Sequence, residues 1–153
     1  MSKTIYLAVI GGGDVSSGIA EMAREVGREA ARRGAVVICG GLGGVMAAAA
    51  QGAVEAGGVT LGILPDGDRR RANPFLTFSL ATNMGHARNL IIAHSADALI
   101  AVDGGYGTVS EAAIALKLGK PVIALEAAWD LAGVKRAASP QEAVALALKG
   151  VGK

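Results

Sequence analysis

The sequence has few of the side chains that build disulfides, metal sites or nucleic-acid surfaces. One cysteine, Cys39, and two histidines occur among 153 residues, so an internal disulfide is impossible and no Cys/His spacing resembles a metal site. Charged residues make up 18% of the chain, 15 basic against 13 acidic, and the one basic cluster is Arg69-Arg70-Arg71. This charge balance gives no reason to expect a basic tract that binds nucleic acid. We therefore expect no metal and no nucleic-acid partner.

The sequence also lacks an uninterrupted hydrophobic segment that reads as a membrane helix. The uncharged stretch 35–54 is long enough to span a bilayer, but Gly40-Gly41 and Gly43-Gly44 interrupt it. The N-terminal residues run directly into an apolar strand, without the features of a signal peptide. We expect no membrane association and a cytoplasmic location, which also suits a single cysteine.

Aromatic residues make up only 3% of the chain, whereas apolar residues make up 52%. The core must therefore consist mainly of Ala, Val, Ile and Leu, and this composition argues against disorder. The length suits one domain, residues 1–153, that buries roughly two-thirds of its unfolded surface.

Apolar strands alternate with helices along the chain. Residues 3–10 form a continuous β-branched and apolar run, which is typical of a strand covered on both faces. Residues 17–33 carry apolar side chains at helical spacing. Further strands are predicted at 35–39, 59–64, 75–80, 98–102 and 121–125, helices at 45–56, 85–95, 108–118 and 140–149, and a loop at 65–74. Because parallel strands need crossover connections, this order predicts an α/β, Rossmann-like doubly wound, mainly parallel sheet with helices on both faces.

The predicted helix 45–56 is apolar on almost every side, with Gln51 and Glu55 its strongly polar residues. Such a helix is covered either by a second subunit or by the core of its own chain. The first alternative predicts a homodimer or homotetramer.

Three of the predicted strands end in glycines that lead into a helix. The turns are Gly11-Gly12-Gly13, Gly40-Gly41-Leu42-Gly43-Gly44 and Gly104-Gly105-Tyr106-Gly107-Thr108. Glycine lets a phosphate approach backbone N–H groups, and the start of a helix adds a favourable dipole. One such turn is more typical of a tight connection. A doubly wound sheet, however, places all three around one crevice, and together they predict phosphate binding.

The common nucleotide-binding motifs are absent. Ser16 stands where a third glycine of the dinucleotide motif would be, and Cys39-Gly40 stands where an acidic residue would end the second strand. Gly119-Lys120 is followed by proline rather than by a hydroxyl residue. These differences argue against a dinucleotide dehydrogenase and exclude a Walker-type ATPase.

Two linked segments carry a family resemblance: Asn83-Met84-Gly85-His86-Ala87-Arg88-Asn89, and residues 98–111, which end in Gly104-Gly105-Tyr106-Gly107-Thr108-Val109-Ser110-Glu111. They resemble the Lonely Guy (LOG)-like proteins, often mislabelled lysine decarboxylases, and the related molybdenum cofactor carrier proteins. The motif Gly-Gly-x-Gly-Thr-x-x-Glu is matched in full. The resemblance implies a Rossmann-like fold, usually dimeric, that holds phosphate at the Gly-Gly-x-Gly-Thr turn.

In the enzyme branch of that family an arginine and the glutamate of the motif assist hydrolysis of the N-glycosidic bond of a nucleoside monophosphate. Arg88 and Glu111 match those positions. The enzyme branch usually has proline before the glycine pair and lysine after the arginine, whereas this chain has Asp103 and Asn89. It therefore looks closer to the carrier branch, in which the pocket is expected to hold the pterin cofactor with its phosphate.

Three functions follow as hypotheses: a molybdenum cofactor carrier, a nucleoside monophosphate phosphoribohydrolase with Arg88 and Glu111 catalytic, and a nucleotide-sensing module. Glu111, near a helix start, is expected to stay ionised, although Thr108 to Glu111 also read as a capping box. The candidate ligand-binding residues are Gly11, Gly12, Gly13, Gly41, Gly43, Gly44, Arg88, Gly104, Gly105, Tyr106, Gly107 and Thr108.

Overall fold

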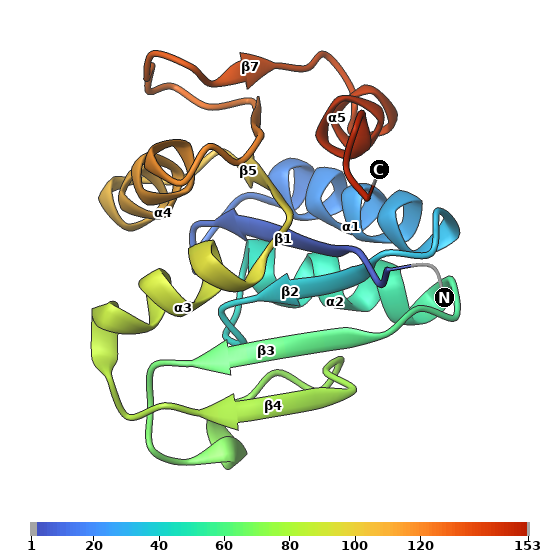
Figure 1. Ribbon diagram of the computed structural model, residues 1–153. Coiled ribbons are helices and arrows are strands. Elements are labelled where there is room, and N and C mark those ends of the chain that lie inside the picture. The colour runs from blue at the N-terminus through green and yellow to red at the C-terminus, as the bar shows by residue number, and fades with distance from the viewer. Residues whose placement is uncertain (1–2, 153) are drawn as a thin grey trace.

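A single parallel sheet with helices on both faces forms the molecule (Figure 1). The computed structural model describes residues 3–152. The strands are β1 (Tyr6–Gly11), β2 (Val36–Cys39), β3 (Thr60–Leu64), β4 (Phe78–Ala81), β5 (Ala98–Val102), β6 (Val122–Leu125) and β7 (Lys135–Arg136). The helices are α1 (Ser17–Arg32), α2 (Val45–Glu55), α3 (Arg88–Ser95), α4 (Tyr106–Lys117) and α5 (Pro140–Leu148), with short 3₁₀ helices η1 (Arg69–Arg71) and η2 (Gly85–Ala87).

The strand order β4-β3-β2-β1-β5-β6-β7 places β1 at the centre of the sheet. From β1 the chain winds outward through β2, β3 and β4, and it then returns to place β5 on the other side of β1. Strands β1 and β5 pair in parallel, from Leu7 opposite Ala98 to Gly11 opposite Val102. Their carboxyl ends therefore diverge into helices on opposite faces, and this switch point is where doubly wound sheets form a crevice.

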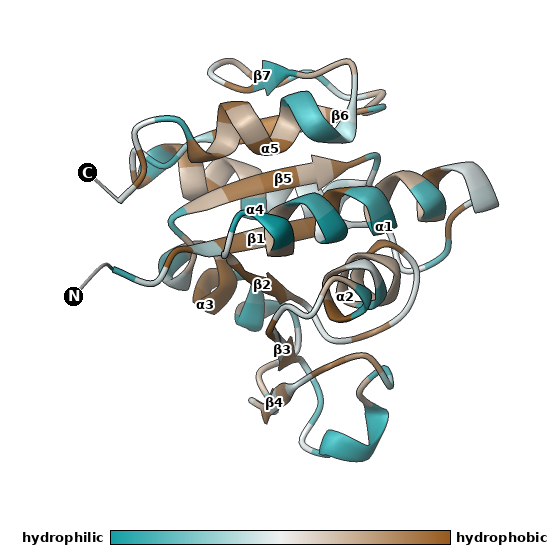
Figure 2. Cartoon of the chain, turned by 90° about the vertical axis from the view of Figure 1, so that its right-hand side faces the viewer, coloured by the Kyte–Doolittle hydropathy of each residue, from teal (hydrophilic) through white to brown (hydrophobic). Residues whose placement is uncertain are grey.

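Two hydrophobic cores lie on the two faces of the sheet. Along β1, Leu7 and Val9 face the core formed with α1, α2 and α5. Ala8 and Ile10 face the core formed with α3 and α4. This alternation within a continuous apolar run explains why β1 has no polar face. Figure 2 shows the hydrophobic strands of the sheet behind α1, whose exposed side is largely hydrophilic.

Helix α2 is covered by its own chain. A Cβ atom at Gly27 of α1 would overlap the backbone carbonyl of Ala49, and one at Gly52 of α2 would overlap the carbonyl of Arg24. The two helices therefore cross with their backbones in close contact, which only glycine permits. The apolar composition of α2 reflects this burial, so it no longer predicts a second subunit.

The expected fold class is confirmed, and most elements lie within two residues of their predicted bounds. Several predictions were wrong in detail. Helix α4 begins at Tyr106, two residues before the predicted start, and the predicted helix 85–95 divides into η2 and α3. The edge strand β4 begins at Phe78 rather than at residue 75, and the two-residue strand β7 was not predicted. Among residues 3–152, no helix is both long and apolar enough to cross a membrane.

Candidate functional site

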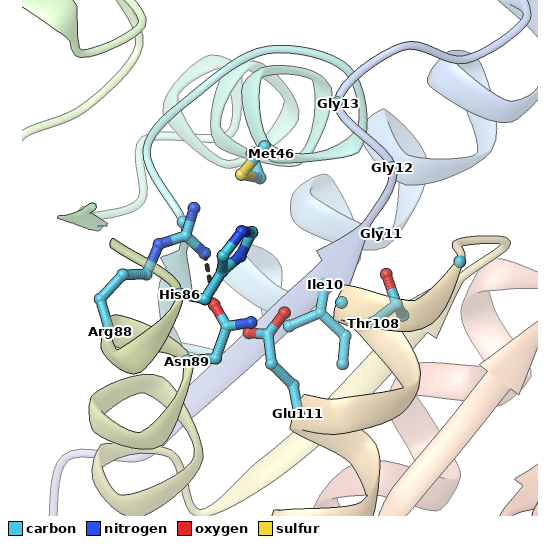
Figure 3. A pocket seen from close by; sticks show the side chains of 13 residues that line it. Ile10, Gly11, Gly12, Gly13, Met46, His86, Arg88, Asn89, Thr108 and Glu111 are labelled. Carbon is cyan, nitrogen blue, oxygen red and sulfur yellow. Dashed lines mark hydrogen bonds between the residues drawn. The ribbon is translucent and has the colours of Figure 1, made fainter. Parts of the chain in front are cut away.

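A cavity of about 260 Å³ opens at the switch point between β1 and β5. Figure 3 shows Arg88, His86 and Asn89 on one side of it and Thr108 and Glu111 on the other. The lining residues are Ile10, Gly11, Gly12, Gly13, Gly40, Met46, His86, Arg88, Asn89, Gly105, Gly107, Thr108 and Glu111. The cavity therefore joins the ends of three strands with η2 and the start of α3.

The first glycine turn forms one wall of the cavity, as predicted. At Gly11 a Cβ atom would meet the side chain of Val45 at 2.7 Å, so the turn packs directly on the start of α2. The backbone N–H of Val45 donates to the carbonyl oxygen of Gly12 over 3.0 Å. These contacts fix the turn while its other side faces the cavity.

In the second turn, the residue that lines the cavity is Gly40, which was not among the predicted ligand-binding residues. A Cβ atom there would lie 2.6 Å from both Arg88 Nη1 and Met46 Sδ. Gly40 therefore packs directly against the guanidinium group of Arg88. Its position beside the predicted turn was visible in the sequence, but its contact with Arg88 depends on tertiary structure.

The remaining glycines of the second turn do not line the cavity but pack against neighbouring segments. Gly41, with φ of 82°, packs against Leu64, and a Cβ atom at Gly43 would approach the carbonyl oxygen of Gly13. Gly44 has φ of 62°, and a Cβ atom there would overlap the backbone of the first turn. The structure thus places Gly41, Gly43 and Gly44 outside the cavity lining, where they shape the turns.

The third turn presents open backbone to the cavity. Gly105 is the N-cap of α4, and no side chain caps this helix. The N–H groups of its first turn therefore have no partner within the helix. No atom lies within 4 Å of an added Cβ at Gly105 or Gly107, so a ligand has room to approach these amides.

Two predicted residues of this turn have other surroundings. Gly104 has φ of 102°, and a Cβ atom there would overlap the side chain of Thr108. Thr108 is 3% exposed and lies at the edge of the cavity. Gly104 and Tyr106 line a neighbouring hollow rather than the main cavity. The turn therefore faces two hollows at once.

Arg88 and Glu111, the two predicted catalytic residues, lie in the same cavity. Arg88 Nε and Glu111 Oε2 are buried and have no hydrogen-bond partner among the described residues. Burial lowers the pKa of the Arg88 guanidinium, and the charge of Glu111 opposes that effect. Buried polar atoms without partners are uncommon in folded proteins, and here both belong to residues that line the cavity.

The expectation that Glu111 stays ionised was wrong. Glu111 is 6% exposed. This burial raises the pKa of its carboxyl group to about 7, although the charge of Arg88 lowers the pKa. A helix that begins at Tyr106 also places Glu111 in its second turn, so the predicted capping box with Thr108 does not form. Near neutral pH this carboxyl group can therefore either accept or donate a hydrogen bond.

Several lining residues were missed from the sequence as site residues. His86 and Asn89 belong to the Asn83–Asn89 segment that carried the resemblance, which was the available signal. Ile10 and Met46 are apolar residues, and nothing in their local sequence distinguishes them from core residues. The other histidine, His94, lies near the end of α3 and does not line the cavity.

The donor set of the cavity suits an anion better than a cation. Open glycine amides, the start of α4 and a guanidinium group provide hydrogen-bond donors. Within residues 3–152, no three His, Cys, Asp or Glu side chains lie together as a metal site requires. Cys39 is buried, and burial raises the pKa of its thiol to about 11, so it is not a reactive thiolate.

The parallel sheet, its strand order and the glycine turns at its switch point define a Rossmann-like α/β protein. The sequence comparison makes this more specific. Residues 4–149 match the model of the SLOG cluster4 family, and the chain belongs to this family.

Known relatives agree with this assignment. A protein from Archaeoglobus fulgidus whose function is uncharacterized is 48% identical over 142 residues, 93% of each chain. The molybdenum cofactor binding protein from the phototrophic bacterium Rippkaea orientalis is similar in structure, with a TM-score of 0.90, 35% identity and 97% of each chain covered. The molybdenum cofactor carrier protein from Chlamydomonas reinhardtii gives a TM-score of 0.83 at 34% identity, with 97% of this chain and 98% of that chain covered.

Proposed function

We propose that this protein binds a phosphate-bearing, nucleotide-like ligand in the cavity between β1 and β5, and that it carries the molybdenum cofactor. The observation that supports this most directly is the cavity itself. It combines the open amides of Gly105 and Gly107 with the buried, unpartnered atoms Arg88 Nε and Glu111 Oε2. A polar ligand that reaches these atoms would give them hydrogen bonds, which would offset the cost of having buried them.

The phosphate is assigned to the N-terminal end of α4. The uncapped N–H groups and the helix dipole favour a negative group there, and Arg88 supplies a positive charge in the same cavity. A neutral Glu111 removes the repulsion that a carboxylate would exert on the phosphate. Because the pKa of Glu111 is about 7, protonation on ligand entry costs little free energy near neutral pH.

The molybdenum cofactor fits this donor set. Its phosphate needs hydrogen-bond donors, which backbone amides and a guanidinium group supply. Gly105, Gly107 and Arg88 would hold the phosphate, and a protonated Glu111 in the same cavity could donate a hydrogen bond to it. Two relatives of more than 30% identity are named as binding or carrying this cofactor.

The test is titration of the purified protein with molybdenum cofactor released from a molybdoenzyme. After rapid desalting, the cofactor retained is measured by the fluorescence of its oxidised pterin. We expect saturable retention, reduced at least about tenfold in affinity by Arg88→Met, which removes a charged hydrogen bond. Retention no better than that of an unrelated protein of similar size would overturn the carrier function.

A second function is supported by the presence of Arg88 and Glu111 in one cavity. In this alternative, water adds across the N-glycosidic bond of a nucleoside monophosphate and yields the free base and ribose 5-phosphate. Positive charge that develops on the ribose would be stabilised by the Glu111 carboxylate. Arg88 would hold the phosphate or orient the sugar.

Incubation with AMP, followed by chromatography for adenine, distinguishes this enzyme from a carrier. A hydrolase releases adenine in a reaction that Glu111→Gln abolishes. The absence of base release from AMP, GMP, CMP and UMP would exclude the enzyme and leave the binding function in place.

We also propose that the protein self-associates, now on different grounds. The edge strand β4 exposes Phe78 and Leu80, which are 63% and 54% exposed. Both lie on a strand with one free edge, and exposed apolar side chains of this kind are typical of subunit contacts. Light scattering on the intact protein and on a Phe78→Lys, Leu80→Lys double variant tests this, since a monomer in both cases would contradict it.

A further inference from the structure

A second hollow adjoins the cavity on the other side of the β5–α4 turn. Its volume is about 310 Å³, and its lining consists of Gly104, Gly105, Tyr106, Val109, Ala128 and Trp129. Gly105 lines both this hollow and the main cavity. No charged side chain is part of the lining, so the hollow suits an uncharged, flat group rather than a second anion.

Trp129 forms a rigid side of this hollow. Its indole N–H donates to the carbonyl oxygen of Asp103, the residue before the glycine turn, over 3.1 Å. Arg136 on β7 donates to the carbonyl oxygens of Ala127 and Trp129 and so fixes the loop that carries the indole. The ring is therefore held beside the turn before any ligand arrives.

Tyr106 lies at the rim of the same hollow and is 96% exposed. Its side chain contributes almost nothing to the core, although the chain has only two tyrosines and one tryptophan. A tyrosine and a tryptophan beside one uncharged hollow are the side chains on which a heteroaromatic ring stacks.

We propose that this hollow, here called the ring subsite, binds the bicyclic nitrogen heterocycle of a ligand whose phosphate lies in the main cavity. This inference rests on the proposed phosphate site and adds the class of the remaining part of the ligand, a purine or pterin. The ring stacks against Tyr106 and Trp129, and Gly105 lies at the junction because a side chain there would separate the two parts of the ligand. Stacking depends on the flat face of a ring and not on the hydrogen-bonding groups at its edge. The subsite therefore accepts several bicyclic rings.

The test compares two probes that share a phosphate, GMP and ribose 5-phosphate. Trp129 is the only tryptophan in the sequence, so its fluorescence reports on the ring subsite, while calorimetry measures both affinities. We expect saturable quenching by GMP alone and a GMP affinity about tenfold higher than that of ribose 5-phosphate.

Tyr106→Ala is the decisive variant, because so exposed a side chain is not needed for folding. It should weaken GMP about tenfold and change ribose 5-phosphate binding by less than about twofold. Leu118→Ala, an exposed apolar side chain at the other end of α4, is the matched control and should change neither. Trp129→Leu should weaken GMP selectively as well.

The outcomes separate this inference from the proposed function. Equal affinities for the two probes, or an equal loss of both in Tyr106→Ala, would overturn the ring subsite and leave the phosphate site standing. If neither probe binds, the phosphate site itself is contradicted, and the ring subsite with it.

Discussion

Arg88 donates a hydrogen bond of 2.9 Å from Nη1 to the side-chain oxygen of Asn89, its neighbour in the chain. Asn89 is buried at the edge of the cavity, and Figure 3 shows its hydrogen bond with Arg88. This contact holds the guanidinium group over Gly40. Lysine, which the LOG-like enzymes usually have at this position, would place a second cation there and could not accept this hydrogen bond. Asn89 therefore orients Arg88 without competing with it for a ligand.

Replacement of Asn89 by alanine tests this role. Without the acceptor, the guanidinium group is no longer held in one orientation, and we expect the affinity for ribose 5-phosphate to fall about tenfold. Calorimetry measures the change, and Gln141→Ala at the start of α5 is the exposed control. An unchanged affinity would show that Arg88 needs no such support.

Gly40→Ala should disturb the same guanidinium group from below. A methyl group would lie 2.6 Å from Arg88 Nη1 and from Met46 Sδ, and both are ends of flexible side chains that can move. We therefore expect a small change in the free energy of unfolding but a loss of about tenfold in phosphate affinity. Gly18→Ala, in the exposed first turn of α1, should leave binding intact. Normal binding by Gly40→Ala would contradict the contact.

The buried carboxyl of Glu111 should make stability depend on pH. Its pKa is about 7 in the folded protein, against an ordinary value of 4.5. Between these values the folded state holds the proton more tightly, so the free energy of unfolding falls as pH rises through this range, by about 3 kcal/mol in total. Glu111→Gln should remove this loss and be more stable than the natural protein at about pH 8, with much less difference at about pH 5.

Urea unfolding at both pH values measures this, with the exposed Glu126→Gln as the control. If Glu111→Gln shows the same fall in stability as the natural protein, the pKa of Glu111 is not raised. The proposal that a neutral Glu111 lies beside the phosphate would then be contradicted.

The crossing of α1 and α2 should tolerate no side chain at its closest point. A Cβ atom at Gly27 would overlap the carbonyl group of Ala49, and backbone cannot move aside as a side chain can. We expect Gly27→Ala to lower the free energy of unfolding by about 3 kcal/mol. In Gly18→Ala the added carbon would approach only Ser16 Oγ, at 4.0 Å, and unfolding measurements should show no loss of stability.

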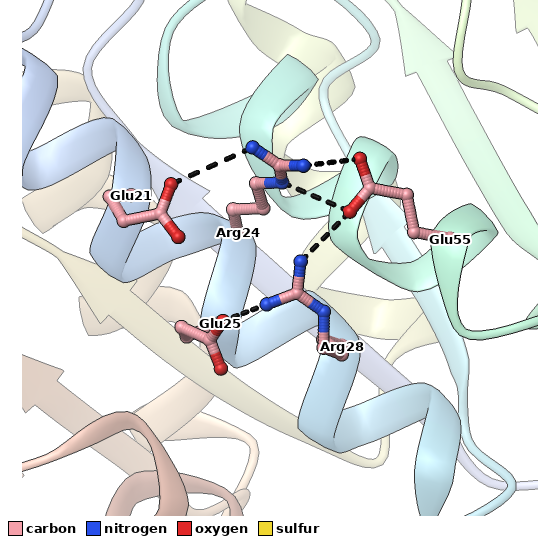
Figure 4. Close-up of polar contacts among 5 residues, drawn as sticks. All are labelled: Glu21, Arg24, Glu25, Arg28 and Glu55. Carbon is pink, nitrogen blue, oxygen red and sulfur yellow. Dashed lines mark hydrogen bonds and ion pairs between the residues drawn. The ribbon is translucent and has the colours of Figure 1, made fainter.

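Ion pairs across the same crossing should have a smaller and salt-dependent effect. Glu55 on α2 accepts hydrogen bonds from Arg24, at 2.6 Å, and from Arg28, at 2.8 Å, on α1 (Figure 4). These two arginines lower the pKa of Glu55, so their stabilisation is present at neutral pH and is lost as pH falls below the ordinary value of 4.5. Glu55→Gln should therefore lower the urea midpoint slightly at neutral pH and low salt, and this difference should vanish in acid. A difference that persists in acid would show that packing, not charge, is responsible.

The sequence was sufficient for the architecture because its signals are local. Continuous apolar runs bounded by glycine located the central strands, and β5 was predicted with its bounds at Ala98 and Val102. The errors lie where local signals are weak. Strand β7 is two exposed residues long and exists because β6 lies beside it, and the start of α4 is set by Gly105 rather than by a capping side chain.

The site was predictable where a motif or a turn marks it, and less so where the fold brings residues together. The first glycine turn, part of the third turn, Arg88 and Glu111 line one cavity, whereas Gly104 and Tyr106 of the third turn line the neighbouring hollow. The contact between Gly40 and Arg88 joins residues far apart in the sequence, and no local pattern records it. The raised pKa of Glu111 likewise arises from desolvation by surrounding elements, which a position near a helix start does not reveal.

The cavity walls come from distant parts of one chain: the turn after β1, the end of β2, η2 with the start of α3, and the start of α4. A ligand bound there would contact segments that must separate before the chain can unfold, so it would make the protein more resistant to heat and proteases. If a ligand binds there, the amount of this protein in a cell would follow the supply of that ligand, with ligand-free copies degraded first.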